Sequence, residues 1–296
     1  MKKITSRKKR LPEWFKQDIP HAQILAKFRY IRKQGVNTVC LEARCPNYYR
    51  CLSANTLTFL ILGNRCTRNC QFCAVEKSRE KSLTLDKQEP YRILKIIKKF
   101  KLNFVIITSV TRDDLDDCGA AQFVSTVDLI HKYKHDIKIE IIIPDFIRPI
   151  LDPVVGVHPD VLAHNLETVP RLYPSIRKKA NYKRSLQVIA DSKKLAPNLI
   201  TKSSLLLGMG ENDNEVIEVM HDLLSVGCDI LVLGQYLAPT PRHFPIKEFV
   251  SIQRFQRYRD IGKGLGFKAV LASPLARTSY KAEEIYNIVK QQPINA

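Results

Sequence analysis

Residues 56–73 read TLTFLILGNRCTRNCQFC, an apolar run that ends in glycine and leads directly into three cysteines. Consecutive apolar positions are typical of a strand that is buried on both faces of a parallel sheet. Similar runs recur with room for a helix between them, at residues 103–110, 137–143, 161–166, 201–208 and 229–237. Amphipathic stretches fill several of these gaps, at residues 89–100, 120–133 and 213–227. We therefore predict an α/β fold in which six strand–helix units form a partial (β/α)6 barrel, similar to a TIM barrel.

The rest of the chain flanks these units on both sides. Residues 1–55 are predicted to form an irregular N-terminal extension with helical pieces, and residues 56–240 to form the barrel. Residues 241–296 would add a helix, a further strand-like run at 268–275 and a tail. No low-complexity segment separates the three parts, so we expect one compact unit.

Composition narrows the class of protein. A chain of 296 residues buries enough surface for a core without disulfides, and no apolar run of 18 residues indicates a membrane span. The start, MKKITSRKKR (1–10), is basic but lacks the apolar stretch of a signal peptide. We therefore expect a cytoplasmic protein in a reducing environment, where clustered thiols usually bind metal or act in catalysis. The net charge of +19, with basic runs such as IRKK (176–179), indicates either a solvated lysine-rich surface or an acidic partner.

Six of the eight cysteines lie within 34 consecutive residues, in two groups of three. The second group, Cys66, Cys70 and Cys73, has the spacing C-x3-C-x2-C and follows the first predicted strand, at the end of the barrel where active sites cluster. Three thiolates can hold three irons of a four-iron cluster and leave the fourth iron open to a small molecule. A closed zinc site would need a fourth ligand, and buried structural cysteines are the other alternative.

The first group, Cys40, Cys45 and Cys51, has the spacing C-x4-C-x5-C and again supplies three thiolates. We interpret it as the binding site of a second cluster. Cys118 lies in an acidic loop and Cys228 at the start of a predicted strand. We interpret these two as ordinary small residues rather than as ligands.

The strand at 56–63 with the second cysteine group resembles the signature of the radical S-adenosylmethionine (SAM) superfamily. In that superfamily an electron from the open cluster cleaves bound SAM to methionine and a 5′-deoxyadenosyl radical, which abstracts hydrogen from an unactivated carbon. The resemblance implies that Cys66, Cys70 and Cys73 hold this SAM-binding 4Fe-4S cluster. Polar residues at predicted strand ends are candidates for contacts with SAM, although each would serve equally well as a cap or turn residue: Ser109, Glu140, Asn165 and Glu167.

Nearly the whole chain further resembles the lipoyl synthase family. The resemblance rests on motifs in this order: CLEARCPN (40–47), GNRCTRNCQFCAV (63–75), TSVTRDDLDDCGAAQF (108–123), IEIIIPDF (139–146), HNLETVPRLY (164–173), RKKANYKRSL (177–186), TKSSLLLGMGE (201–211), GCDILVLGQYL (227–237) and ASPLARTSY (272–280). Members of this family insert two sulfur atoms, at C6 and C8, into an octanoyl chain on a lysine of a lipoyl carrier domain. An auxiliary cluster donates the sulfur, so the resemblance implies SAM and two 4Fe-4S clusters as cofactors.

In that family a serine of a C-terminal R-S-S-Y motif is the fourth protein ligand of the auxiliary cluster. The corresponding stretch here is Arg277-Thr278-Ser279-Tyr280, so the second serine corresponds to Ser279. Thr278 replaces the first serine and is not expected to be a ligand. To reach the first cysteine group, the tail must fold back over the barrel mouth. A second departure is Cys118, which stands where the family usually has glycine.

The resemblance also implies partners. These are octanoylated carrier domains (2-oxoacid dehydrogenase E2 subunits and the glycine cleavage H protein), a flavodoxin- or ferredoxin-type reductant and an iron–sulfur cluster carrier, with no membrane and no nucleic acid. Lipoyl carrier domains tend to be acidic, so a basic face around the barrel mouth would steer them.

Two other functions compete with this interpretation. A radical SAM methylthiotransferase acting on tRNA would also carry two clusters, but here the first cysteine group is compact and no RNA-binding domain is predicted after the barrel. A cysteine-rich metal module that binds nucleic acid is the non-enzymatic alternative, and the strand–helix alternation argues against it.

Overall fold

The computed structural model describes residues 11–17, 19–78 and 84–292, so the basic start at 1–10 lies outside the described residues. Within the described residues, the main sheet has eight strands in the order β1-β2-β5-β6-β7-β8-β9-β10. Strand β1 pairs antiparallel with β2, and all other neighbours are parallel. The strand bounds are β1 (Asn37–Thr38), β2 (Leu57–Ile61), β5 (Phe104–Ser109), β6 (Lys138–Ile142), β7 (Val161–Ala163), β8 (Ile200–Leu207), β9 (Ile230–Gln235) and β10 (Ala269–Ser273).

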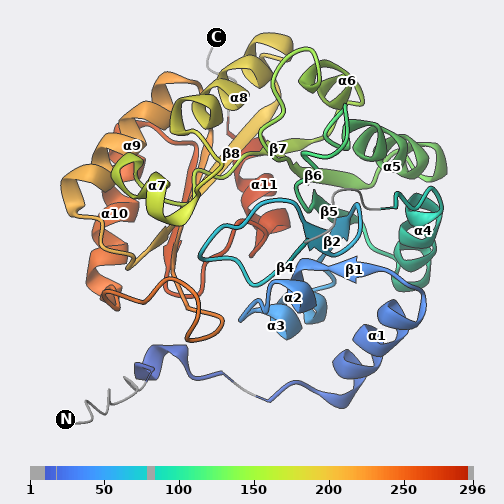
Figure 1. The fold of residues 1–296 in the computed structure, drawn as a ribbon, viewed down its shortest axis with the longest axis horizontal. Coiled ribbons are helices and arrows are strands. Elements are labelled where there is room, and N and C mark those ends of the chain that lie inside the picture. The colour runs from blue at the N-terminus through green and yellow to red at the C-terminus, as the bar shows by residue number, and fades with distance from the viewer. Residues whose placement is uncertain (1–10, 18, 79–83, 293–296) are drawn as a thin grey trace.

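Helices cover the outer face of this sheet, and Figure 1 shows them as a ring around the strands. They pack against apolar side chains that the strands present on consecutive positions; every residue of β2 and of β9 is buried. The outer helices are α4 (Glu89–Phe100), α5 (Ala120–Tyr133), α6 (Leu151–Gly156), α8 (Tyr182–Leu195), α9 (Asp213–Ser225) and α10 (Ile252–Leu265). Short helical turns, η2 (Pro170–Leu172) and α7 (Tyr173–Ile176), precede α8.

The predicted α/β partial barrel is confirmed. Each of the six predicted strands forms at its expected place, and the order of strands ends at β1 and β10 without a pair between them in the described residues. The strand-like run at 268–275 also joins the sheet, because β10 pairs parallel with β9 from Ala269 opposite Ile230 onward. The C-terminal segment therefore contributes one more strand to the barrel than the six expected.

The C-terminal helix α11 (Ala282–Lys290) lies inside the barrel, as Figure 1 shows. Its apolar face packs on inward-facing strand residues in a buried cluster with Phe104, Val161 and Ile230. Tyr286 hydroxyl donates to Asp160 Oδ1 at 3.1 Å, just before β7 begins. The helix thus fills the barrel interior near the amino ends of the strands. The turn before it, residues 276–281, lies at the opposite end, where the strands terminate. The sequence did not predict this interior helix.

The N-terminal extension is more regular than expected. It contains η1 (Glu13–Phe15), α1 (Ala22–Lys33), β1, α2 (Val39–Glu42) and α3 (Tyr48–Ser53). Strand β1 extends the main sheet, and Leu52 of α3 is fully buried in the first hydrophobic cluster. At the start of the N-terminal extension, the centroid of the Phe15 ring lies 5.9 Å from the centroid of the Phe249 ring. Among the helices of the described ranges, none combines the length and apolar composition that a membrane crossing would need.

Candidate active site

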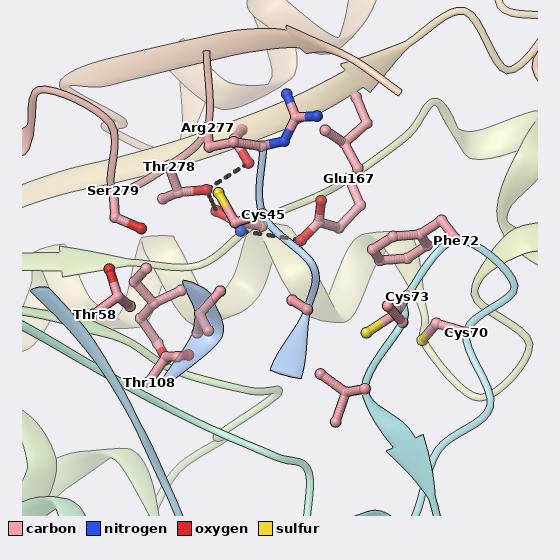
Figure 2. Close-up of a pocket in the computed structure, with 18 of the residues that line it drawn as sticks. Cys45, Thr58, Cys70, Phe72, Cys73, Thr108, Glu167, Arg277, Thr278 and Ser279 are labelled. Atoms are coloured by element: carbon pink, nitrogen blue, oxygen red, sulfur yellow. Dashed lines mark hydrogen bonds between the residues drawn. The ribbon is translucent and has the colours of Figure 1, made fainter. Parts of the chain in front are cut away.

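The carboxyl ends of the strands enclose a cavity of about 540 Å3. This volume falls in the range of about 300–1,000 Å3 that is typical of small-molecule sites. Cys45, Cys66, Cys70, Cys73 and Ser279 all line it, so the structure brings together residues of both cysteine groups and of the tail. In Figure 2, Cys70 and Cys73 lie together on one side, and Cys45 lies with Arg277 and Thr278 on the other.

The second cysteine group sits on a loop closed by a small parallel pair of strands, β3 (Arg65–Cys66) and β4 (Glu76–Lys77). Thr67 anchors the start of the loop, since its hydroxyl donates to the Thr111 carbonyl at 2.9 Å. In the middle, the Gln71 amide donates to the Ile176 carbonyl at 2.8 Å. Lys77 Nζ donates to the Cys73 carbonyl at 3.0 Å. These bonds hold all three thiols against the cavity.

Arg68, between the first two cysteines of this loop, makes a double ion pair. Its Nε and Nη2 donate to Asp113 at 2.9–3.2 Å, and its Nη1 donates to the buried Asp145. Asp145 also lies 3.3 Å from His164 Nε2. Although burial opposes it, His164 and Arg68 hold the pKa of Asp145 well below its usual range. The loop is therefore fastened by charge to the ends of two neighbouring strands.

The first cysteine group lies between β1 and β2, with Cys40 on α2, Cys51 on α3 and Cys45 in the turn between these two short helices. Cys40 is buried, and its carbonyl accepts from the Cys45 amide at 3.2 Å. The Cys51 carbonyl accepts from the Thr56 amide at 2.9 Å. Of the three, only Cys45 lines the cavity. Asn47, which is fully buried, donates from Nδ2 to the Leu275 carbonyl at 2.5 Å and so ties this group to the tail.

The structure places the four strand-end candidates differently. Ser109, Asn165 and Glu167 line the cavity. Glu140 is not among the lining residues; it lies fully buried within the barrel, where both carboxylate oxygens accept from Lys202 Nζ at 2.8–2.9 Å. The carboxylate of Glu140 is therefore turned to Lys202 inside the barrel and not to the cavity.

Sequence reasoning missed Arg177, which lines the cavity and is nearly buried. Its Nη1 donates to the carbonyls of Asn165 and Leu166 and to the Tyr173 hydroxyl, at 2.8–3.1 Å. Its Nε has no hydrogen-bond partner among the described residues, and neither has the buried hydroxyl of Ser109. Arg177 belongs to the basic run IRKK and begins the motif RKKANYKRSL, which the sequence analysis used for the overall charge and for the family resemblance but not as part of the site.

Burial dominates the electrostatics of the thiols. It raises the pKa of Cys51 to about 12 and that of Cys70 to about 11, although the Arg177 guanidinium opposes the shift at Cys70. Burial likewise raises the pKa of Cys45, and Arg277 opposes it. Thiols with raised pKa values stay protonated at neutral pH, so metal binding here would release protons.

The residues present fit the expected groups. In the described part of the chain, no three His, Cys, Asp or Glu side chains converge on a point where one metal ion would bind. A cubane cluster makes a different demand, because each thiolate binds a separate iron. The unpartnered Arg177 Nε and Ser109 Oγ at the cavity wall match the carboxylate and amino groups of an amino-acid ligand such as SAM. Cys118 and Cys228 do not line the cavity.

Comparison with known proteins identifies the class first. Residues 60–223 match the model of the radical SAM superfamily, so the chain is a radical SAM protein. Solved structures agree on the fold. The FeFe-hydrogenase maturase HydG of Carboxydothermus hydrogenoformans superposes with a TM-score of 0.61 at 13% identity, over 93% of this chain and 63% of that one. Methylornithine synthase superposes with a TM-score of 0.55 at 16% identity, over 82% and 70%.

The particular family follows from sequence relatives. The chain is 44% identical over 281 residues to the lipoyl synthase of Caldicellulosiruptor saccharolyticus, which covers 94% of this chain and 98% of that protein. It is 50% identical over 258 residues to the lipoyl synthase of Aquifex aeolicus, covering 86% and 93%. The chain belongs to the lipoyl synthase family. It is a radical SAM enzyme that inserts sulfur, with SAM and two 4Fe-4S clusters as cofactors and a lipoyl carrier protein as substrate.

Proposed function

We propose that this enzyme inserts sulfur at C6 and C8 of an octanoyl chain held on a lysine of a carrier domain, within the cavity at the barrel mouth. The observation that carries this proposal is that the whole second cysteine group, Cys45 of the first group and Ser279 line one cavity. When bound there, the SAM-binding cluster supplies the electron for radical formation and the auxiliary cluster supplies the sulfur. The apolar part of the wall, which includes Leu60, Val110 and Ile142, suits an acyl chain.

In this proposal the polar part of the wall holds SAM. Cys66, Cys70 and Cys73 hold its cluster, and Ser109, Asn165 and Glu167 contact the cofactor. Arg177 joins them, since carbonyls occupy its Nη1 while its Nε has no partner among the described residues and can donate to a carboxylate. Burial raises the pKa of Glu167, and the nearby Arg177 and Asn165 partly offset the shift. Glu140 serves instead to hold β6 against β8 through Lys202.

Cys40, Cys45, Cys51 and Ser279 would hold the auxiliary cluster. The tie between Asn47 and Leu275 supports this assignment, because it fastens the tail four residues before Ser279 to the first cysteine group. The extension (1–55), the barrel (56–240) and the C-terminal segment (241–296) then act as one catalytic unit, since each supplies part of the cavity wall.

The preferred partners are proposed from charge and redox chemistry. A net charge of +19 favours acidic carrier domains, such as those of 2-oxoacid dehydrogenase E2 subunits and the glycine cleavage H protein, and an acidic flavodoxin- or ferredoxin-type reductant. An iron–sulfur cluster carrier would rebuild the auxiliary cluster. All eight cysteines are free, which supports a reducing cytoplasm.

Two measurements on anaerobically purified protein test the proposal. Iron and sulfide analysis is expected to give about eight irons per chain, as two four-iron clusters require. Incubation with SAM, a reductant and an octanoyl-lysine peptide is expected to yield a lipoyl-lysine peptide, detected by its mass. Zinc in place of iron, or 5′-deoxyadenosine without sulfur insertion by the fully loaded enzyme, would contradict the proposal.

A further inference from the structure

The hydroxyl of Thr278 connects the C-terminal tail to two residues that line the cavity, Asn165 and Ser204. Thr278 Oγ1 donates to Asn165 Oδ1 at 3.1 Å, and it lies 2.9 Å from Ser204 Oγ. Asn165 in turn donates from Nδ2 to Glu167 Oε1 at 3.0 Å. Figure 2 shows these hydrogen bonds as dashed lines between Thr278 and Glu167. A continuous chain of side-chain bonds therefore joins segments more than 100 residues apart.

The chain of bonds has one direction. Asn165 donates to Glu167 from Nδ2, so its Oδ1 is the atom that accepts from Thr278. The single proton of Thr278 is then used, and Ser204 must donate to Thr278. Hydrogen bonds aligned in this way polarise one another. Thr278 and Ser204 are 8% and 4% exposed, so water has little access to replace either bond.

Ser204 contacts both ends of this series of hydrogen bonds, Glu167 through its backbone and Thr278 through its side chain. Glu167 adopts a left-handed conformation, with φ of 66°, which a residue with a side chain holds only when its surroundings impose it. The imposing contacts come from β8: the Glu167 amide donates to the Ser204 carbonyl, and the Leu206 amide donates to the Glu167 carbonyl, each at 2.9 Å. The same Ser204 holds Thr278 through its side chain.

We propose that Thr278 is a positioning residue that couples closure of the tail to the binding of SAM. The inference rests on the proposed function, in which Asn165 and Glu167 contact SAM and Ser279 holds the auxiliary cluster. When the tail is docked, Thr278 fixes the orientation of the Asn165 amide. The amide then holds the carboxyl group of Glu167 in position for its contact with SAM. By reciprocity, SAM that orders Asn165 and Glu167 stabilises the tail next to Ser279 by the same factor. The threonine in place of the family's serine keeps the hydroxyl that this role needs.

The test compares Thr278→Val, which keeps the shape and loses the hydroxyl, with Thr278→Ser, which keeps the hydroxyl. In the holoenzyme, Thr278→Val is expected to weaken SAM binding about tenfold, because a buried partner loses its hydrogen bond. Backbone hydrogen exchange of residues 276–281 is expected to rise in this variant, and SAM should protect this segment less than in the unmodified enzyme. Thr278→Ser is expected to match the unmodified enzyme in both measurements.

The apoprotein gives a second measurement that does not depend on cluster loading. The bonds of Thr278 join protein side chains only, so the tail of Thr278→Val should also exchange faster in the apoprotein. Unchanged SAM affinity and tail exchange in Thr278→Val would overturn the proposal, as would equal losses in Thr278→Val and Thr278→Ser. Failure of the unmodified holoenzyme to bind SAM would instead overturn the proposed function itself.

Discussion

The two cysteine groups are held in place by different forces. The first lies on two short helices and the turn between them, and apolar side chains of this segment pack into the core, with Leu52 fully buried. The second lies on a loop whose position depends on polar bonds and on the charge of Arg68. The second also lines the cavity with all three thiols, whereas the first exposes only Cys45 to it.

The difference matches the two kinds of chemistry. A cluster that binds a small molecule must present an open iron to a cavity, so its loop lies at the surface of that cavity and is fastened from behind. A cluster that gives up sulfur needs an opening to the same cavity, and packing can enclose its remaining sides. Variants in the two groups should therefore fail in different ways.

The largest expected effect separates the two groups outright. Cys70→Ala should abolish reductive cleavage of SAM, because the open cluster loses one of its three thiolates. Cys45→Ala should still form 5′-deoxyadenosine but yield no lipoyl product. Both quantities are measured in one assay by liquid chromatography and mass spectrometry. Lipoyl product from Cys45→Ala would show that the first group is not the sulfur donor site.

The next effect concerns Ser279 at the edge of the first group. Ser279→Ala should keep SAM cleavage but lower sulfur insertion by at least about 100-fold, since loss of a direct ligand should cost no less than loss of an outer contact. Ser279→Cys should keep the cluster yet slow the reaction, because a thiolate binds iron more tightly than an alkoxide.

Thr278→Ser is the matched control for the Ser279 variants, because it changes the adjacent residue and keeps a hydroxyl there. It should insert sulfur at the normal rate, and iron content should be the same in the control and in Ser279→Cys. Normal product formation by Ser279→Ala would place the fourth ligand elsewhere.

Much of this architecture was predictable from the sequence, for reasons that are local. Consecutive apolar runs predicted the barrel strands, and amphipathic spacing predicted α4 and α5 at their observed bounds. Cysteine spacing marked the two groups, and the binding of a cluster by each of them stays a prediction. The interior position of α11 was not predictable, because an amphipathic helix packs equally well inside or outside a sheet until its partners are known. Arg177 and the bonds of Thr278 were missed for the same reason, since their partners lie far away in the chain.

A smaller effect tests whether charge fastens the second group. Arg68→Gln leaves the buried carboxylate of Asp145 without its guanidinium and should lower the free energy of unfolding of the apoprotein by about 3 kcal/mol. Arg65→Gln is the matched control, because Arg65 lies on the same loop and makes an exposed ion pair with Glu76 at 3.9 Å. Its loss should cost less than about 1 kcal/mol. Urea unfolding measures both, and equal costs would contradict the role of Arg68.

The smallest effect concerns the acidic loop whose Asp113 holds Arg68. Cys118, at the end of this loop, has a φ of 53°, a left-handed conformation that costs a residue with a side chain about 1–2 kcal/mol. Cys118→Gly should remove that strain, and the greater freedom of glycine in the unfolded chain should cancel about half of the gain. We therefore expect the free energy of unfolding to rise by up to about 1 kcal/mol, measured by urea unfolding of the apoprotein. Cys118→Ala removes the thiol but keeps the strained backbone, so it should not share the gain. If Cys118→Ala were as stable as Cys118→Gly, the left-handed backbone at Cys118 would not lower the free energy of unfolding. The loop behind the second cysteine group would then carry no more backbone strain than the segment that bears the first.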